Sequence, residues 1–126
     1  MVRLISNGQS DSPSPVPVSD STKVFTMVES PAAFHGGANA WRIYLENNLN
    51  YPKKAIRKNI QGVVRVQFIV DKEGNISEVV ALNDPSGGLA EEAVRIIKAG
   101  PRWKPAEQNH KKVIYRHIQS LTFKLE

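Results

Sequence analysis

The chain has 126 residues, no cysteine and a formal charge of +5; 40% of it is apolar and 23% is charged. This balance is typical of one small globular domain, and it excludes a wholly disordered chain and a disulfide scaffold. No run of about 20 apolar residues, the length that crosses a bilayer, is present. The start of the chain also lacks the apolar region of a signal peptide. We therefore expect a cytoplasmic chain or a piece of a longer protein.

The first part of the chain differs in composition from the rest. Residues 6–22 contain six serines and three prolines but only two large apolar residues, both valines. Such a segment cannot bury enough apolar surface to offset the entropy lost on ordering. We predict a Ser/Pro-rich disordered tether over residues 1–22 and a folded domain over residues 23–126.

The predicted helices follow from apolar spacing. After a weakly alternating stretch at 23–29, which predicts a short strand, large apolar residues recur every four positions from Trp41 to Leu49 and indicate an amphipathic helix over 38–49. Pro52 is well placed to open a second helix over 53–58. A third helix is predicted over 89–99, where Gly100 and Pro101 end it.

Three stretches predict longer strands. In 63–71 the residues Val64, Val66, Phe68 and Val70 share one face, and a hairpin loop with Gly74 at positive φ leads into a strand over 76–82. There we expect one face to hold Ile76, Val80 and Leu82. The last strand spans 113–125, with a bulge or a change of exposed face near Ser120. The order predicts an α+β fold, with helices packed on one face of a small antiparallel sheet.

The sequence offers little chemistry. The three histidines, His35, His110 and His117, lie far apart without metal-ligand spacing, and Glu91 and Glu92 are helix neighbours that point about 100° apart. No nucleophile, base and orienting group come together in sequence. We therefore expect no catalytic residues, no metal and no cofactor. The basic cluster at 53–58 lacks interleaved aromatic residues, so we interpret it as a solvated helix face and expect no nucleic-acid partner.

An ordered set of motifs resembles the TonB C-terminal domain family over about residues 24–125. The set comprises the Glu29–Gly37 segment, the Asn48–Pro52 segment with its Tyr-Pro pair, the strand from Gly62 to Asp71, the Pro101–Ala106 segment and the closing Leu121–Phe123. The segment before the Tyr-Pro motif is similar to the type common in Bacteroidetes, although it departs slightly in spacing and lacks a proline beside Phe34. The resemblance implies a three-stranded sheet.

The resemblance also implies a function. Family members are periplasmic domains that couple the energised inner membrane to active transporters of the outer membrane, and they bind a short transporter peptide, the TonB box, as an added strand. It implies contact with inner-membrane proteins of the ExbB/ExbD type through an N-terminal anchor that this chain does not contain. Partner contacts are expected on the Tyr-Pro segment and on the edge of the last strand, namely at Asn50, Tyr51, Pro52, Val113, Ile114, Tyr115, Arg116, His117, Ile118, Gln119 and Ser120.

Elementary physics supports the same mechanism, because an unpaired strand edge is a template for another strand. Alternatives stay open at this point. The edge could be covered by the chain itself or pair with a second copy as a homodimer. The domain could also serve a membrane-anchored sensor or peptidase with a different peptide ligand, or bind nucleic acid or a cell-wall polymer with steep salt dependence. We expect Trp103 to plug the core rather than an interface, and for Tyr51 both roles remain open.

Overall fold

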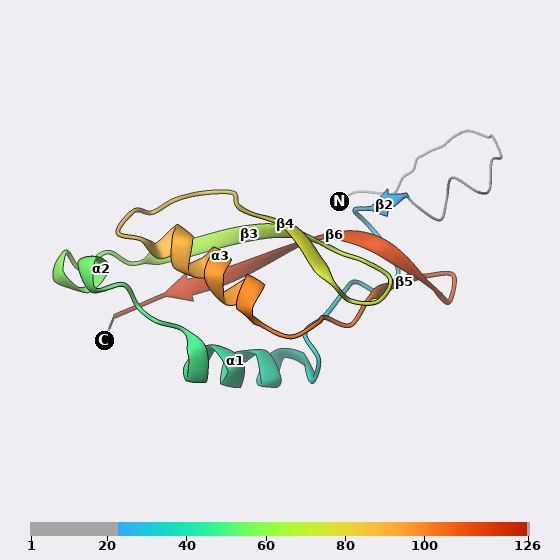
Figure 1. Cartoon of the computed structure of the whole chain (residues 1–126), viewed down its shortest axis with the longest axis horizontal. Helices are drawn as coiled ribbons and strands as arrows, with labels where there is room; N and C mark the ends of the chain where they lie inside the picture. Colours follow the sequence, from blue (N-terminus) through green and yellow to red (C-terminus); the bar gives the residue numbers. More distant parts are fainter. Residues whose placement is uncertain (1–22, 126) are drawn as a thin grey trace.

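The computed structural model describes residues 23–125, and the predicted tether over residues 1–22 lies outside them. The described chain is an α+β fold in which the helices accompany a long twisted sheet (Figure 1). The predicted helices and strands all form, with ends shifted by at most two residues, except that the strand predicted over 23–29 is limited to Val24–Phe25. In chain order the elements are β2 (Val24–Phe25), α1 (Gly37–Asn48), α2 (Lys53–Arg57), β3 (Gly62–Val70), β4 (Ile76–Ala81), α3 (Leu89–Ala99), β5 (Ala106–Gln108) and β6 (Lys111–Phe123).

The sheet is larger than the three antiparallel strands that were expected. Its order is β2-β6-β3-β4, and β5 additionally pairs with the start of β6. The three predicted strands form its antiparallel centre. The two short strands extend it, and β2 pairs with β6 in parallel, so the sheet is mixed. A strand at β2 was predicted, although its place in the sheet was not, whereas β5 has only three residues, too few for a strand pattern to stand out in the sequence.

The core lies on one face of β3. Val64, Val66, Phe68 and Val70 are fully buried there, as the alternation predicted. Helix α3 lies across this face and buries a stripe that includes Leu89 and Ile96 (Figure 1). Burial of each such side chain stabilises the fold by about 1.5–3 kcal/mol. Helix α1 packs against α3, where Tyr44 Oη donates a hydrogen bond to the Ile96 carbonyl oxygen at 2.7 Å.

Strand β4 departs from the predicted pattern. Gln67 pairs with Val80 but Ile69 pairs with Ser77, so three steps on β4 oppose two on β3. The extra residue makes a bulge at which Glu78 adopts a φ of 52°. A one-residue slip exchanges the two faces of a strand. The prediction that Val80 and Leu82 share the inner face with Ile76 was therefore wrong: both are exposed, and Ile76, Val79 and Ala81 pack on the core.

Strand β6 departs in the opposite sense, because it is more regular than expected. Its pairing with β3 runs without a break from Gly62↔Phe123 to Val70↔Tyr115. The predicted bulge near Ser120 is absent from this ladder. That expectation rested on the three apolar residues at 113–115, which do not alternate with polar ones. In the structure the alternation holds, with His117 and Gln119 on the same inner side as the buried Leu121. No helix within residues 23–125 is long and apolar enough to cross a membrane.

Candidate functional site

The sequence analysis predicted the outer edge of β6 as the binding edge. Hydrogen bonds elsewhere in the sheet show which main-chain N–H and C=O groups of β6 point toward that edge. The Arg65 amide donates to Asn83 Oδ1 at 2.8 Å, and the Arg65 carbonyl oxygen accepts from the Leu82 amide at 2.7 Å. The main chain of Arg65 is therefore directed toward β4. Its partner on the other side, Ser120, must form a non-hydrogen-bonded pair in the antiparallel ladder.

The alternation of an antiparallel ladder extends this result along β6. If Ser120 directs its N–H and C=O away from β3, then Arg116, Ile118 and Thr122 do the same. Within residues 23–125, the strand on this edge is β2, and it pairs with β6 only at Ile114 and Tyr115. The parallel pairing of Phe25 with Tyr115 takes up the outward N–H of Arg116. The Arg116 carbonyl and three consecutive outward pairs of donors and acceptors, at Ile118, Ser120 and Thr122, thus face away from the sheet with no strand of the described chain beside them.

The predicted open edge over 113–120 needs a correction at its start. Val113 pairs with Ala106 of β5, and Ile114 and Tyr115 pair with Val24 and Phe25 of β2. Tyr115 also pairs with Val70, so β2 lies on the side of β6 opposite β3. The chain's own first described strand therefore occupies part of the edge. The part left open in the described chain runs from Arg116 to Thr122, which we call the open edge.

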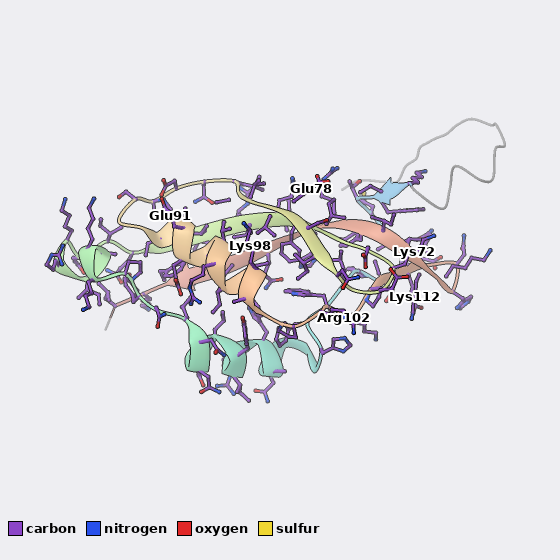
Figure 2. All side chains as sticks on the ribbon, in the orientation of Figure 1. Lys72, Glu78, Glu91, Lys98, Arg102 and Lys112 are labelled. Carbon is purple, nitrogen blue, oxygen red and sulfur yellow. The ribbon has the colours of Figure 1, made fainter. Side chains whose placement is uncertain are left out.

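The solvent side of β6 is basic. Lys111, Lys112 and Arg116 are exposed, and β6 contains no acidic residue. Ile118, between Arg116 and Ser120, keeps 47% of its surface exposed. In Figure 2 the labelled side chains of Lys72 and Lys112 lie toward the β5 end of the sheet. A ligand with acidic residues would therefore be attracted to this border of the molecule.

The inner side of the open edge holds His117 and Gln119. The His117 Nε2 atom and Gln119 Oε1 are 2.9 Å apart, and His117 Nδ1 is buried without a partner in the described part of the chain. The ring packs near those of Phe68, Trp103 and Tyr115, with centroid distances of 5.4, 5.2 and 5.8 Å. Burial among these rings lowers the pKa of His117, against a smaller opposing effect of the Gln119 hydrogen bond. The ring is therefore neutral near pH 7.

The Tyr-Pro segment lies at the other end of β6. The Asn50 amide donates to Glu92 Oε2 at 2.7 Å, and the Tyr51 hydroxyl donates to the Ile60 carbonyl oxygen. The Tyr51 ring meets Phe123 edge to face, with centroids 5.6 Å apart. Asn50, Tyr51 and Pro52 thus lie beside the C-terminal end of β6, away from Val113 to Tyr115. Contacts within the chain occupy the Tyr51 hydroxyl, which favours a packing role for this residue.

An aromatic cluster beside β6 was not predicted as a site. Trp103 is buried, with 2% of its surface exposed, as expected for a core residue. Its ring lies 5.6 Å from both Phe34 and Trp41, which come from the segment before α1 and from α1 itself. These residues and His117 are up to 83 positions apart in the chain. One local signal was available: His117 and Gln119, two residues apart on a strand, share a face.

The described residues provide no other chemical centre. No group of three or more His, Asp or Glu side chains within residues 23–125 could hold a metal ion. Glu92 has a structural partner instead: its carboxylate accepts hydrogen bonds from Arg95 at 2.7 and 2.8 Å and from the Asn50 amide. Glu91, exposed on α3, points elsewhere (Figure 2). The open edge of β6 is therefore the candidate site.

Comparison with known proteins agrees with this geometry. Residues 47–125, from the end of α1 through β6, match the family model described as the Gram-negative bacterial TonB protein C-terminal domain. The matched range includes both the Tyr-Pro segment and the whole open edge. A search of curated proteins finds no match.

Proposed function

The chain belongs to the family of Gram-negative bacterial TonB C-terminal domains, which are periplasmic protein-interaction domains, and on that premise we propose that it binds the TonB box of outer-membrane transporters. The peptide adds to the sheet as a further strand along the open edge of β6. Joined through an upstream anchor to proteins of the ExbB/ExbD type, the domain then supports active uptake of nutrients.

The observation that carries the proposal is the set of outward N–H and C=O groups at Ile118, Ser120 and Thr122, together with the Arg116 carbonyl. An extended peptide satisfies such groups along a line, as strands do in any sheet. Each main-chain hydrogen bond contributes about 0.5–1.5 kcal/mol net. Several bonds in a row give a micromolar complex that still dissociates, which suits a coupling domain that must release its transporter.

The charge of β6 favours the same kind of ligand. Lys111, Lys112 and Arg116 raise the local concentration of acidic peptides and speed their association. A second copy of the chain, by contrast, would bring the same set of cations to the interface. A peptide with acidic residues is therefore a better partner for this edge than a second β6.

The test is a titration of the isotope-labelled chain with peptides from the N-termini of outer-membrane TonB-dependent transporters of the same organism, followed by NMR. We expect amide shifts concentrated at 116–122 and dissociation constants in the micromolar range. Scrambled peptides of identical composition serve as the control, because they keep the charge but not the side-chain order. Shifts confined to the Tyr-Pro segment, or no shifts for any transporter peptide, would contradict the proposal.

A further inference from the structure

A cavity of about 230 Å³ lies next to the open edge. Its walls come from four parts of the chain: the segment before α1, the first half of α1, Trp103 between α3 and β5, and the inner side of β6. The β6 wall is His117 and Gln119, the two inner residues on either side of Ile118. The cavity therefore lies beside Ile118, whose outward N–H and C=O are in the middle of the open edge.

The cavity lies beyond β6 rather than beneath the sheet centre. None of its lining residues belongs to β3, β4 or α3, and the β3 neighbours of this part of β6, Val66 and Phe68, are fully buried without lining it. A strand added to β6 would lie about 4.8 Å farther out. Its inward side chains would point in the same direction as His117 and Gln119, toward this cavity.

The lining is apolar and spacious. The rings of Phe34, Trp41 and Trp103 form its floor, while Ala33 and Ala38 leave room between them. A Cβ atom added at Gly37 would meet no atom within 4 Å, so this wall is open. The volume equals that of about eight water molecules in the liquid, which is enough for one large side chain.

From this placement we propose that the cavity is a specificity pocket, which takes one large apolar side chain of the peptide that adds to β6. The inference rests on the proposed strand addition and adds to it a rule for sequence. The preferred peptide has a large aliphatic or aromatic residue next to the position that pairs with Ile118, where its side chain points inward to the pocket. It has acidic residues where the side chains point outward, on the same side of the sheet as Arg116.

The occupant is a peptide of another protein for two reasons. The pocket is continuous with the open edge, so a peptide whose side chain fills the pocket also has its main chain in place to pair with the edge. The exposed cations of β6, at Lys111, Lys112 and Arg116, select against a second β6 and in favour of acidic flanks. A second copy seated in the pocket is an outcome that the test distinguishes.

The probe is a set of nine-residue peptides in which Thr and Glu alternate, with Thr at both ends and the central Thr position varied. The central residue is Ala, Val, Leu, Phe or Lys, so charge on the flanks and strand propensity stay nearly constant. Binding to the full chain is measured by NMR shifts of the amides at 116–122. We expect the Phe and Leu peptides to bind about tenfold more tightly than the Ala peptide, and the Lys peptide to bind more weakly still.

The variant Ala38→Phe supplies the decisive comparison. Ala38 is exposed on α1 and lines the pocket, so its replacement fills the cavity without disturbing the core. We expect the tenfold preference for Phe over Ala in the peptide to fall to about one. The matched control is Asn47→Phe, which adds the same ring at an exposed position on α1 outside the pocket lining and should keep the preference.

The outcomes separate the two proposals. If transporter peptides bind at 116–122 but the central residue of the probe has no effect, the pocket is overturned and strand addition stands. If neither transporter peptides nor probes shift these amides, both fail. If the chain dimerises on concentration and Ala38→Phe alone abolishes the dimer, a second copy is the occupant and the pocket proposal is overturned.

Discussion

The two borders of the sheet differ in a way that bears on function. Strand β4 closes one side of the described sheet with only six residues and a bulge at Glu78, whereas β6 is thirteen residues long and nine of them, from Tyr115 to Phe123, pair with β3 in unbroken register. Proteins usually protect a strand edge by making it short, bulged, charged or covered, since a flat edge invites another strand. The edge of β4 has three of these protections, because Glu78 adds a charge to its bulge (Figure 2).

The edge of β6 carries charge at Arg116, but it is neither short nor bulged, and the two-residue strand β2 covers it only at Ile114 and Tyr115. Beyond it the outward groups from the Arg116 carbonyl to Thr122 have no strand of the described chain beside them, and a cavity opens on the inner side. The difference indicates that one border is built to end the sheet and the other to continue it. Each of the following predictions alters one border.

The largest effect is expected when the outward amide of Ile118 is removed. In Ile118→Pro the ring replaces an N–H that does not pair with β3, so the strand itself can persist, as prolines do on edge strands. We expect affinity for transporter peptides to fall about thirtyfold or more. Ile118→Thr keeps the amide and the branched side chain, and should bind within about twofold of the original chain.

Isothermal titration calorimetry measures both affinities, and circular dichroism with thermal unfolding checks that both variants fold. Equal affinities for the proline and threonine variants would mean that the peptide does not add at this edge.

The reverse change is made on β4. Deletion of Glu78 leaves Ser77 opposite Ile69 and Val80 opposite Gln67, with Val79 alone opposite Phe68, so the bulge disappears while the faces are kept. We expect the flat edge to pair with that of a second copy. In sedimentation velocity, dimers of the deletion variant should appear at a concentration about tenfold lower than the concentration at which the original chain first dimerises.

The control is Glu78→Gly, which keeps the bulge. Because Glu78 has a φ of 52°, where glycine is not strained, this variant should be more stable by about 1 kcal/mol and should not associate. If deletion leaves sedimentation unchanged, the bulge does not protect the β4 edge.

These two borders also show what the sequence could and could not predict. The alternation from Val64 to Val70 was sufficient to place the core face of β3, because its period of two is uninterrupted. In β4 the same reasoning failed, since an extra residue exchanged the faces and no glycine marked the bulge. In β6 the consecutive apolar residues at 113–115 indicated a bulge, whereas the strand is regular and its inner residues His117 and Gln119 line a cavity.

The site was only partly predictable. A long last strand could be predicted from its β-branched and aromatic residues, but its coverage at Ile114 and Tyr115 depends on Val24 and Phe25, some 90 positions earlier. The pocket likewise requires Phe34, Trp41 and Trp103 to converge through the tertiary fold. Such convergence leaves no local pattern, so only the structure brings these residues together.

A moderate effect is expected from charge on the open edge. Arg116 is exposed on β6, and its replacement by Glu would repel an acidic peptide that the original chain attracts. We expect Arg116→Glu to weaken binding about three- to tenfold at low salt, mainly through slower association, and Arg116→Gln to have about half that effect in free energy. Stopped-flow fluorescence measures the association rates.

In 0.5 M salt the differences in association rate should largely disappear, because screening shortens the range of exposed charges to a few ångströms. A difference that persists would indicate a direct contact between Arg116 and the peptide instead.

The smallest effect concerns the inner faces of the two borders. The inner side of β4 presents the apolar residues Ile76, Val79 and Ala81, whereas that of β6 holds the titratable His117. Because burial lowers the pKa of His117 in the folded chain, the unfolded chain takes up this proton first as the pH falls. The contribution of His117 to stability is thus fully present above its unfolded pKa of about 6.5 and is lost as the pH falls below it.

The test compares urea unfolding of the original chain and His117→Gln at pH 7.5 and 5.5. We expect the free energy of unfolding to fall more between these values in the original chain, whatever the absolute stability of the variant. The rings of Phe68, Trp103 and Tyr115, which surround His117, do not titrate in this range, so the difference reports on the histidine alone. A bound peptide that seals the pocket would bury the His117 ring further and lower its pKa again. Peptide affinity should therefore also decline on acidification in the original chain and not in the variant. Parallel pH profiles for the two proteins would show that the inner side of the β6 border is open to water, and would weaken the case that an apolar side chain is received there.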